Sequence, residues 1–248
     1  MSMNYSIILG NLGNTCDRFL SSGYKEELDK DTMLKQASQI NRVKGIELVG
    51  TWDIDESNVR EMKQKLDDHG LNCVSIIPDL FSQKKWGNGS FSSANSDIRK
   101  AAVAEVNTCT DMAVEMNCDL LNIWPGQDGY DYALCADYME ERQWFAEGIR
   151  ESALYAAKKG VRFALEYKLK EPRTHSYLAR AADTILLINE LDMENVGACI
   201  DSGHAFAAYE NVGESISLFK MAGDKLFHMH YNDNYSAWDD DMIVGSLR

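Results

Sequence analysis

The chain contains 248 residues, of which 45% are hydrophobic, and carries 39 acidic against 25 basic side chains, a formal charge of −14. This length and apolar content suffice for a large core within one domain, and no apolar run reaches the ~20 residues of a membrane-spanning helix, so we expect a soluble protein. The negative charge repels phosphate backbones and anionic membranes, so neither nucleic acid nor membrane is an expected partner.

Short runs rich in Ile, Val and Leu alternate with longer segments of helical period, which predicts a repeated strand–loop–helix unit. The seven predicted strands are Ser6–Gly10, Gly45–Gly50, Asn72–Pro78, Cys118–Trp124, Val161–Lys168, Val196–Asp201 and Lys225–Tyr231. The predicted helices are Asp31–Val43, Asp55–His69, Ser96–Asn117, Asp137–Lys159, Tyr177–Leu191 and Val212–Met221. The loop Asp79–Ser93 is long enough to cover a site.

Nearly continuous apolar strands separated by helices indicate parallel pairing with both faces of the sheet covered. Two α/β architectures fit, an open doubly wound sheet and a closed (β/α)8 barrel. A doubly wound nucleotide binder would carry a glycine-rich phosphate loop, but the segment Gly10–Gly13 lacks the third glycine and a following helix start. Polar residues instead follow strand after strand, where a barrel places its active site. We therefore predict a single TIM-barrel domain over residues 1–248.

The densest group of polar residues follows the last predicted strand. The stretch from His228 to Asp241 holds two imidazoles and four carboxylates. His228 and His230 share one face of their strand by the period-two rule, as do Glu166 and Lys168 two strands earlier. Both pairs are also compatible with purely structural roles, in the core or in a surface ion pair.

Three consecutive predicted strands end in ligand-type side chains, Glu166, Asp201 and His230. Neighbouring parallel strands hold such ends roughly 5 Å apart, which is the scale of a metal-ligand cluster. The segment Asp201-Ser-Gly203-His204 taken alone fits a helix cap or a turn equally well; as a turn at Gly203 it would let Asp201 and His204 converge. Carboxylates with one or two imidazoles suit Mn²⁺, Mg²⁺ or Co²⁺, whereas zinc is more typically held by all-sulfur or all-nitrogen ligand sets.

These strand ends resemble those of the xylose isomerase-like TIM barrels, and most closely the L-rhamnose isomerase branch of the metal-dependent sugar isomerases. The resemblance rests on Glu166-Tyr-Lys168, on Asp201-Ser-Gly-His204, and on His230-Tyr-Asn-Asp233 followed by Asp239-Asp-Asp241. It covers the second half of the chain, and the interval from His230 to the aspartate run is one residue longer than in the family pattern. Trp124-Pro-Gly126 is similar to a segment that lines the sugar pocket in that family.

The resemblance implies particular roles. A structural metal would be held by Glu166, Asp201 and His230, and a catalytic metal by His204, Asp239 and Asp241. Catalytic roles would fall to Glu166, Lys168 and His204, and substrate contacts to Trp124, Lys168 and Asp233. Mn²⁺ is the expected ion, with Co²⁺, Mg²⁺ and Zn²⁺ as alternatives, and the expected partner is a small sugar.

The implied reaction is the interconversion of an aldose and a ketose, or sugar epimerisation if a carboxylate abstracts the proton. Two other classes stay open: a barrel without catalytic activity, and a metal-dependent apurinic endonuclease, against which five histidines and the negative charge argue. Only seven residues follow Asp241, so we expect the barrel to be incomplete at the C-terminus, lacking its last strand and helices. Homo-oligomerisation is left open.

The six cysteines, Cys16, Cys73, Cys109, Cys118, Cys135 and Cys199, form no CxxC pair. The N-terminus shows no basic-then-apolar leader. These two observations predict reduced thiols and a cytoplasmic location.

Overall fold

The structure is a computed structural model that describes residues 3–13 and 23–248. It consists of two compact units, Met1–Asp79 with Thr108–Leu121, and Leu80–Asn107 with Asn122–Arg248. The boundaries between them fall after β3, within helix α3 (Ser96–Glu115) and within strand β4 (Leu120–Ile123). Cys16 lies outside the described residues, and the five other cysteines are free thiols.

All seven predicted strands are present and belong to one sheet, in the order β1-β2-β3-β4-β6-β8-β9. Their bounds are β1 Tyr5–Ile8, β2 Val43–Val49, β3 Asn72–Ile77, β4 Leu120–Ile123, β6 Arg162–Glu166, β8 Val196–Asp201 and β9 Leu226–His230. The pairs β1–β2, β2–β3, β3–β4, β6–β8 and β8–β9 are parallel. This confirms the predicted parallel α/β arrangement, and in the described part of the chain no eighth strand joins the sheet.

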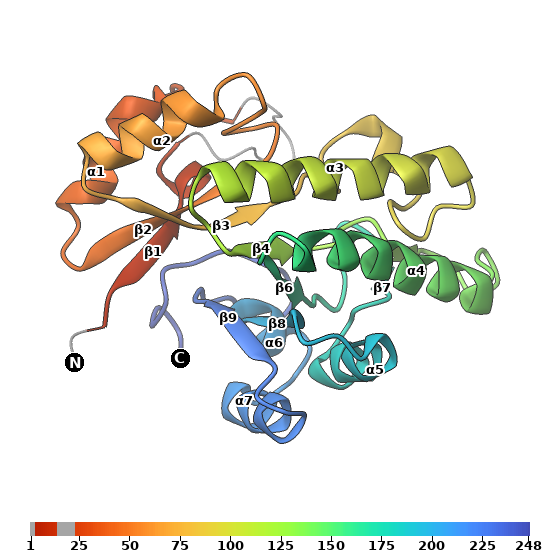
Figure 1. Ribbon diagram of the computed structural model, residues 1–248. Helices are drawn as coiled ribbons and strands as arrows, with labels where there is room; N and C mark the ends of the chain where they lie inside the picture. Colours follow the sequence, from red (N-terminus) through yellow and green to blue (C-terminus); the bar gives the residue numbers. More distant parts are fainter. Residues whose placement is uncertain (1–2, 14–22) are drawn as a thin grey trace. The chain divides into compact units, whose positions relative to one another are not determined.

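In the first unit, α1 (Lys30–Gln39) and α2 (Val59–Asp68) cover the same face of strands β1 to β3 (Figure 1). Both helices are shorter than predicted. Helix α1 is capped by Asp29, whose side chain accepts a hydrogen bond from the Thr32 amide. The helix ends at Gln39, and Arg42, soon after it, has a left-handed backbone conformation with φ +67°. Helix α2 begins late because Asp55 instead accepts the amides of Ser57 and Asn58 in a turn.

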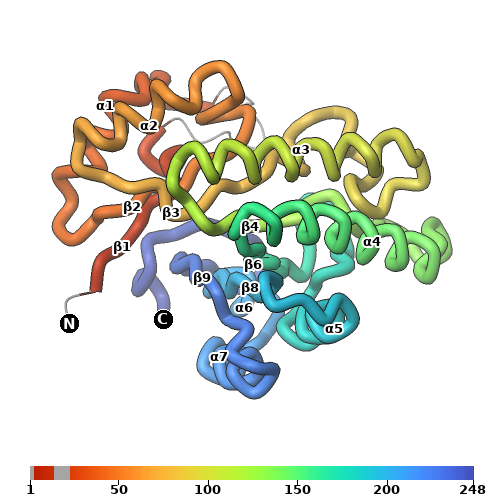
Figure 2. The backbone as a smooth tube through the Cα atoms, in the orientation of Figure 1, coloured from red at the N-terminus to blue at the C-terminus, as the bar shows by residue number. Residues whose placement is uncertain are grey.

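In the second unit, α4 (Tyr138–Ala157), α5 (Ala181–Leu191) and α7 (Val212–Met221) lie around strands β6, β8 and β9 (Figure 2). The buried strand residues Phe163, Leu165 and Val196 form part of the core, together with helical side chains such as Phe145 and Leu187. Helix α5 starts four residues later than predicted. The residues before it are extended, since Tyr177 donates its amide to Asp128 and Leu178 accepts the amide of Lys168.

Several short elements were not predicted. They are two 3-10 turns, Leu9–Leu12 and Lys84–Trp86, the antiparallel pair β5 (Gly129–Tyr130) and β7 (His175–Ser176), and helix α6 (Ser202–Ala207). Their two to six residues are too few for a hydrophobic period to show. No helix in the described part of the chain is both long and apolar enough to cross a membrane.

Candidate metal centre

The candidate site lies in the second unit, at the carboxyl ends of three strands. Glu166 ends β6, Asp201 ends β8 and His230 ends β9. Glu166 pairs in register with Cys199, and Asp201 with His230, so the three strand ends meet at one edge of the sheet. Glu166 and Asp201 are buried, with 5% and 4% of their surfaces exposed. Burial of two carboxylates requires compensating partners.

His204 reaches this group from α6. Asp201 is the N-cap of that helix and accepts a hydrogen bond from the His204 amide at 2.9 Å, so the helix-cap alternative holds and the segment does not turn sharply at Gly203. Glycine is required for another reason, because a Cβ on Gly203 would lie 1.8 Å from Asn232 Oδ1. The His204 Nδ1 atom lies 3.0 Å from the Tyr167 carbonyl oxygen and 3.3 Å from Glu166 Oε1.

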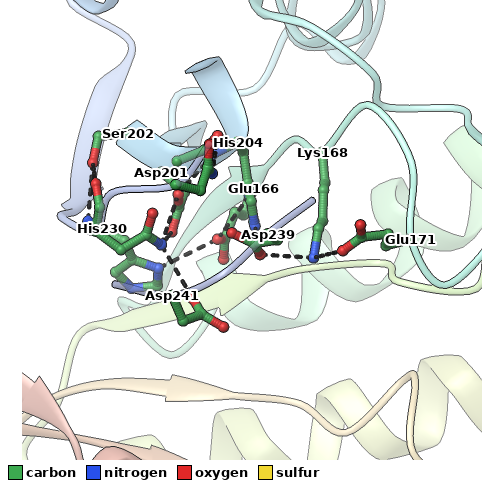
Figure 3. Close-up of polar contacts among 12 residues, drawn as sticks. Glu166, Lys168, Glu171, Asp201, Ser202, His204, His230, Asp239 and Asp241 are labelled. Carbon is green, nitrogen blue, oxygen red and sulfur yellow. Dashed lines mark hydrogen bonds and ion pairs between the residues drawn. The ribbon is translucent and has the colours of Figure 1, made fainter. Parts of the chain in front are cut away.

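Asp239 and Lys168 complete one side of the cluster (Figure 3). Asp239 Oδ2 lies 3.1 Å from His204 Nε2 and 2.8 Å from Lys168 Nζ. The same Nζ atom lies 3.3 Å from Glu171, a carboxylate that the sequence analysis did not identify. Its position three residues after Lys168 and directly before Pro172 was the available clue.

The opposite side of Glu166 faces His230 and Asn122. The His230 Nδ1 atom lies 3.3 Å from Glu166 Oε1, and the Asn122 side-chain amide donates a hydrogen bond to Oε2. Asn122 was also missed, although it is the one polar residue inside the otherwise apolar strand β4 and is fully buried. The ring of His228 packs edge-on against that of His230, with centroids 5.0 Å apart.

Asp241 is linked to Asp201 by the side-chain amide of Asn232, which donates hydrogen bonds to both carboxylates. Asn232 Nδ2 donates to both carboxylate oxygens of Asp201, at 3.1 and 2.9 Å, and to Asp241 Oδ1 at 3.2 Å. Trp124 lies beside Lys168, whose Nζ is 5.2 Å from the indole centroid, and its ring packs against Phe81 at 4.7 Å.

Asp233 is the one predicted site residue that the structure does not bring into the cluster. Its buried carboxylate accepts hydrogen bonds from the amides of Asn234, Leu247 and Arg248. A carboxylate engaged by three backbone donors holds the end of the chain and has little capacity left for a substrate.

The electrostatics of the cluster follow from its density of charge. Burial raises the pKa of Glu166, but His230, His204 and Asn122 outweigh burial and lower it to about 2. Burial lowers the pKa of His204, yet Asp201, Asp239 and Glu166 raise it to about 9. Burial dominates at Asp201 and raises its pKa. The opposite shifts of Glu166 and His204 both favour the charged form of the side chain, because each group faces the other's opposite charge.

The donor atoms fit a divalent cation. Ligand atoms of Glu166, Asp201 and His204 all lie within 4.8 Å of one another. Asp239 Oδ1 is buried without a hydrogen-bond partner in the described structure, which is costly unless a cation or water meets it. Carboxylate oxygens with imidazole nitrogens form a suitable set for Mn²⁺, Co²⁺ or Mg²⁺.

Comparison with known proteins agrees with this architecture. A family model described as xylose isomerase-like TIM barrel matches residues 34–246, and the chain belongs to this family. This confirms the predicted fold class. The narrower L-rhamnose isomerase branch stays a prediction.

Among curated relatives, the xylose isomerase of Thermus thermophilus is 31% identical over 192 residues, which are 76% of this chain and 49% of the relative. The xylose isomerase of Thermus caldophilus is 29% identical over the same length. The chain thus spans about half the length of the curated relatives it matches.

Solved structures show the same fold at lower identity. A D-tagatose 3-epimerase-like protein superposes with a TM-score of 0.75 at 18% identity, covering 98% of this chain and 81% of the other. D-psicose 3-epimerase from Clostridium cellulolyticum H10 with D-tagatose gives 0.70 at 21% identity, covering 93% and 73%.

Proposed function

We propose that this protein is a divalent-metal-dependent sugar isomerase that interconverts an aldose and a ketose. The observation that carries the proposal is the placement of Lys168 Nζ 2.8 Å from Asp239, beside the buried group of Glu166, Asp201 and His204. Such an arrangement combines ligands for a cation with a separate hydrogen-bond donor for a substrate oxygen. The likeness to xylose isomerases over 76% of the chain supports the choice of reaction.

Two cations would be held by two neighbouring sets of residues. Glu166, Asp201 and His230 would form one site, and His204, Asp239 and Asp241 would form the other, with Mn²⁺ as the expected ion and Co²⁺, Mg²⁺ or Zn²⁺ as alternatives. A bound metal would supply Lewis-acid polarisation of the sugar carbonyl and stabilisation of negative charge that develops on its oxygen.

The chain's own side chains would orient the sugar. Burial lowers the pKa of Lys168, but Asp239 and Glu171 outweigh this and raise it, so the side chain stays a cation and can donate to a sugar hydroxyl or carbonyl oxygen. The indole of Trp124, in contact with Phe81, supplies an apolar wall for the C–H face of a sugar.

The same carboxylates could instead exchange a proton with the carbon next to the carbonyl, which would make the protein an epimerase. The proposed experiment separates these outcomes. Metal-stripped protein is incubated with Mn²⁺, Co²⁺, Mg²⁺ or Zn²⁺ and a panel of neutral aldoses, ketoses and their epimers in deuterated water, and the products are followed by NMR. Aldose–ketose conversion supports the isomerase, and ketose epimerisation with deuterium uptake replaces it by the epimerase.

A control with Glu166→Gln protein must be inactive, and Glu151→Gln, an exposed change on α4, must behave as the parent. Failure to convert any sugar with any of the four metals would reject the proposal, and cleavage of abasic DNA by the same preparation would replace it by the endonuclease.

A further inference from the structure

A cavity lies in the same unit, and none of its lining residues belongs to the metal centre. It has a volume of about 390 Å³ and is bounded by loop residues near β5 and by the start of α4. This volume falls in the lower part of the range of small-molecule sites, ~300–1,000 Å³. Six of its wall residues carry the argument: Asn88, Asn95, Tyr130, Cys135, Glu141 and Arg173.

The walls of this cavity are held rigidly. Asp128 is 1% exposed and accepts hydrogen bonds from the amides and hydroxyls of both Ser90 and Ser92, which anchors the loop that carries Asn88 and Asn95. The next residues form β5, which pairs with β7, and the Tyr130 ring stacks on that of His175 at 4.7 Å with an interplanar angle of 5°. A preformed wall lowers the entropic cost of binding.

The lining mixes polar and apolar groups and carries no excess of positive charge. Arg173 Nε lies 3.0 Å from Asp131, and Arg173 Nη1 donates a long hydrogen bond of 3.4 Å to the Gln127 carbonyl oxygen. One carboxylate oxygen of Glu141 accepts a hydrogen bond from the Tyr177 hydroxyl, and the carboxylate adds a negative charge to the wall. An anion such as a phosphate would be repelled by the Glu141 carboxylate, and the nearby Arg173 guanidinium is already paired with Asp131. The cavity therefore does not favour anions.

Amide, hydroxyl, carboxylate and guanidinium groups around one cavity offer both donors and acceptors, which suits hydroxyl groups that act as both. We propose that this cavity binds a neutral saccharide, as a second carbohydrate site in addition to the metal centre. The two sites share the segment that follows β6. Glu171 in that segment contacts Lys168 of the centre, whereas Arg173 two residues later lines the cavity.

Cys135 gives a local readout for this proposal, because it lines the cavity and is exposed, whereas the four other described cysteines are buried. The rate of Cys135 carbamidomethylation by iodoacetamide is followed by peptide mass spectrometry, with EDTA present to exclude metal-dependent sugar binding. D-Fructose at about ten times its dissociation constant should slow the reaction about tenfold. D-Fructose 6-phosphate should protect less.

Variants locate the bound sugar. Ala94→Trp places a large ring in the cavity wall and should abolish protection, and Asn88→Ala should weaken it several-fold without changing packing, since Asn88 is exposed. Asn4→Ala, an exposed asparagine outside the cavity, and Glu166→Gln should both keep full protection. Circular dichroism checks that each variant is folded.

Equal alkylation rates with and without D-fructose in the parent protein would overturn the proposal, as would stronger protection by the phosphorylated sugar or loss of protection in folded Glu166→Gln protein. None of these results depends on turnover. Saccharide binding in the cavity can therefore be rejected while the proposed isomerase activity stands, and the isomerase activity can be rejected while saccharide binding stands.

Discussion

Two buried carboxylates in the same unit, Asp128 and Glu166, have opposite environments. Asp128 is surrounded by neutral donors, the amides and hydroxyls of Ser90 and Ser92, and its pKa is raised because burial outweighs these hydrogen bonds. Glu166 faces two imidazoles and the Asn122 amide, and its pKa falls to about 2 despite burial. One carboxylate is fully satisfied by a single loop, whereas the other depends on groups from β4, β9 and α6.

The difference separates a carboxylate that anchors a loop from one that belongs to the proposed metal centre. Asp128 accepts four hydrogen bonds from one short segment, which is what a loop anchor requires. Glu166 offers one of three ligand atoms, with those of Asp201 and His204, that all lie within 4.8 Å of one another, a geometry that can hold a cation. We therefore expect changes at Glu166 to affect metal and activity, and changes at Asp128 to affect stability.

The largest expected effect comes from Glu166→Gln. Loss of one ligand charge should weaken Mn²⁺ binding and lower kcat/KM by about 10³-fold or more, because a metal contributes several kcal/mol to transition-state stabilisation. Isothermal titration calorimetry and the sugar assay measure the two quantities, with Glu151→Gln as the matched control. Parental metal affinity in the variant would remove Glu166 from the centre.

Asp128→Ala should reverse this pattern. The amides of Ser90 and Ser92 would be left buried without acceptors, so the free energy of unfolding should fall by about 2–4 kcal/mol while Mn²⁺ affinity stays within a few-fold of the parent. Urea unfolding and calorimetry test both statements, and Asp183→Ala on exposed α5 serves as the control. An equal loss of metal affinity and stability would mean that the two carboxylates are not independent.

Lys168→Met tests a third kind of residue in the same unit. The Lys168 side chain contacts the proposed metal ligand Asp239 but is not itself a proposed ligand. We expect kcat/KM to fall about 10²-fold, since a buried donor to a developing negative charge is lost, and Mn²⁺ affinity to change by less than about tenfold. Lys158→Met, at the exposed end of α4, should have no effect. A variant that loses its metal would instead make Lys168 a positioning residue for Asp239.

The same contrast explains what could be predicted from the sequence. Seven strands and the ends bearing Glu166, Asp201 and His230 were predictable, because apolar runs and the period-two rule place them directly. The anchoring role of Asp128 was not predicted, since its partners Ser90 and Ser92 lie 38 and 36 residues away in the chain. Asn122 and Glu171 were missed for a similar reason, because their partners are set by tertiary packing.

The smallest expected effect is the pH dependence of stability at Asp128. Its pKa in the folded protein lies above the ordinary value of 3.8, so the folded state binds the proton more tightly than the unfolded state. The contribution of Asp128 to the free energy of unfolding is then fully present below pH 3.8 and is lost as the pH rises through the raised value. As the pH falls toward that window, Asp128→Asn should therefore lose stability more steeply than the parent protein. The linkage slopes of the two proteins should differ by less than one proton. Urea titrations of both proteins in EDTA, with Asp183→Asn as control, measure the slopes. Parallel slopes would mean that folding leaves the pKa of Asp128 unchanged, which would contradict the prediction.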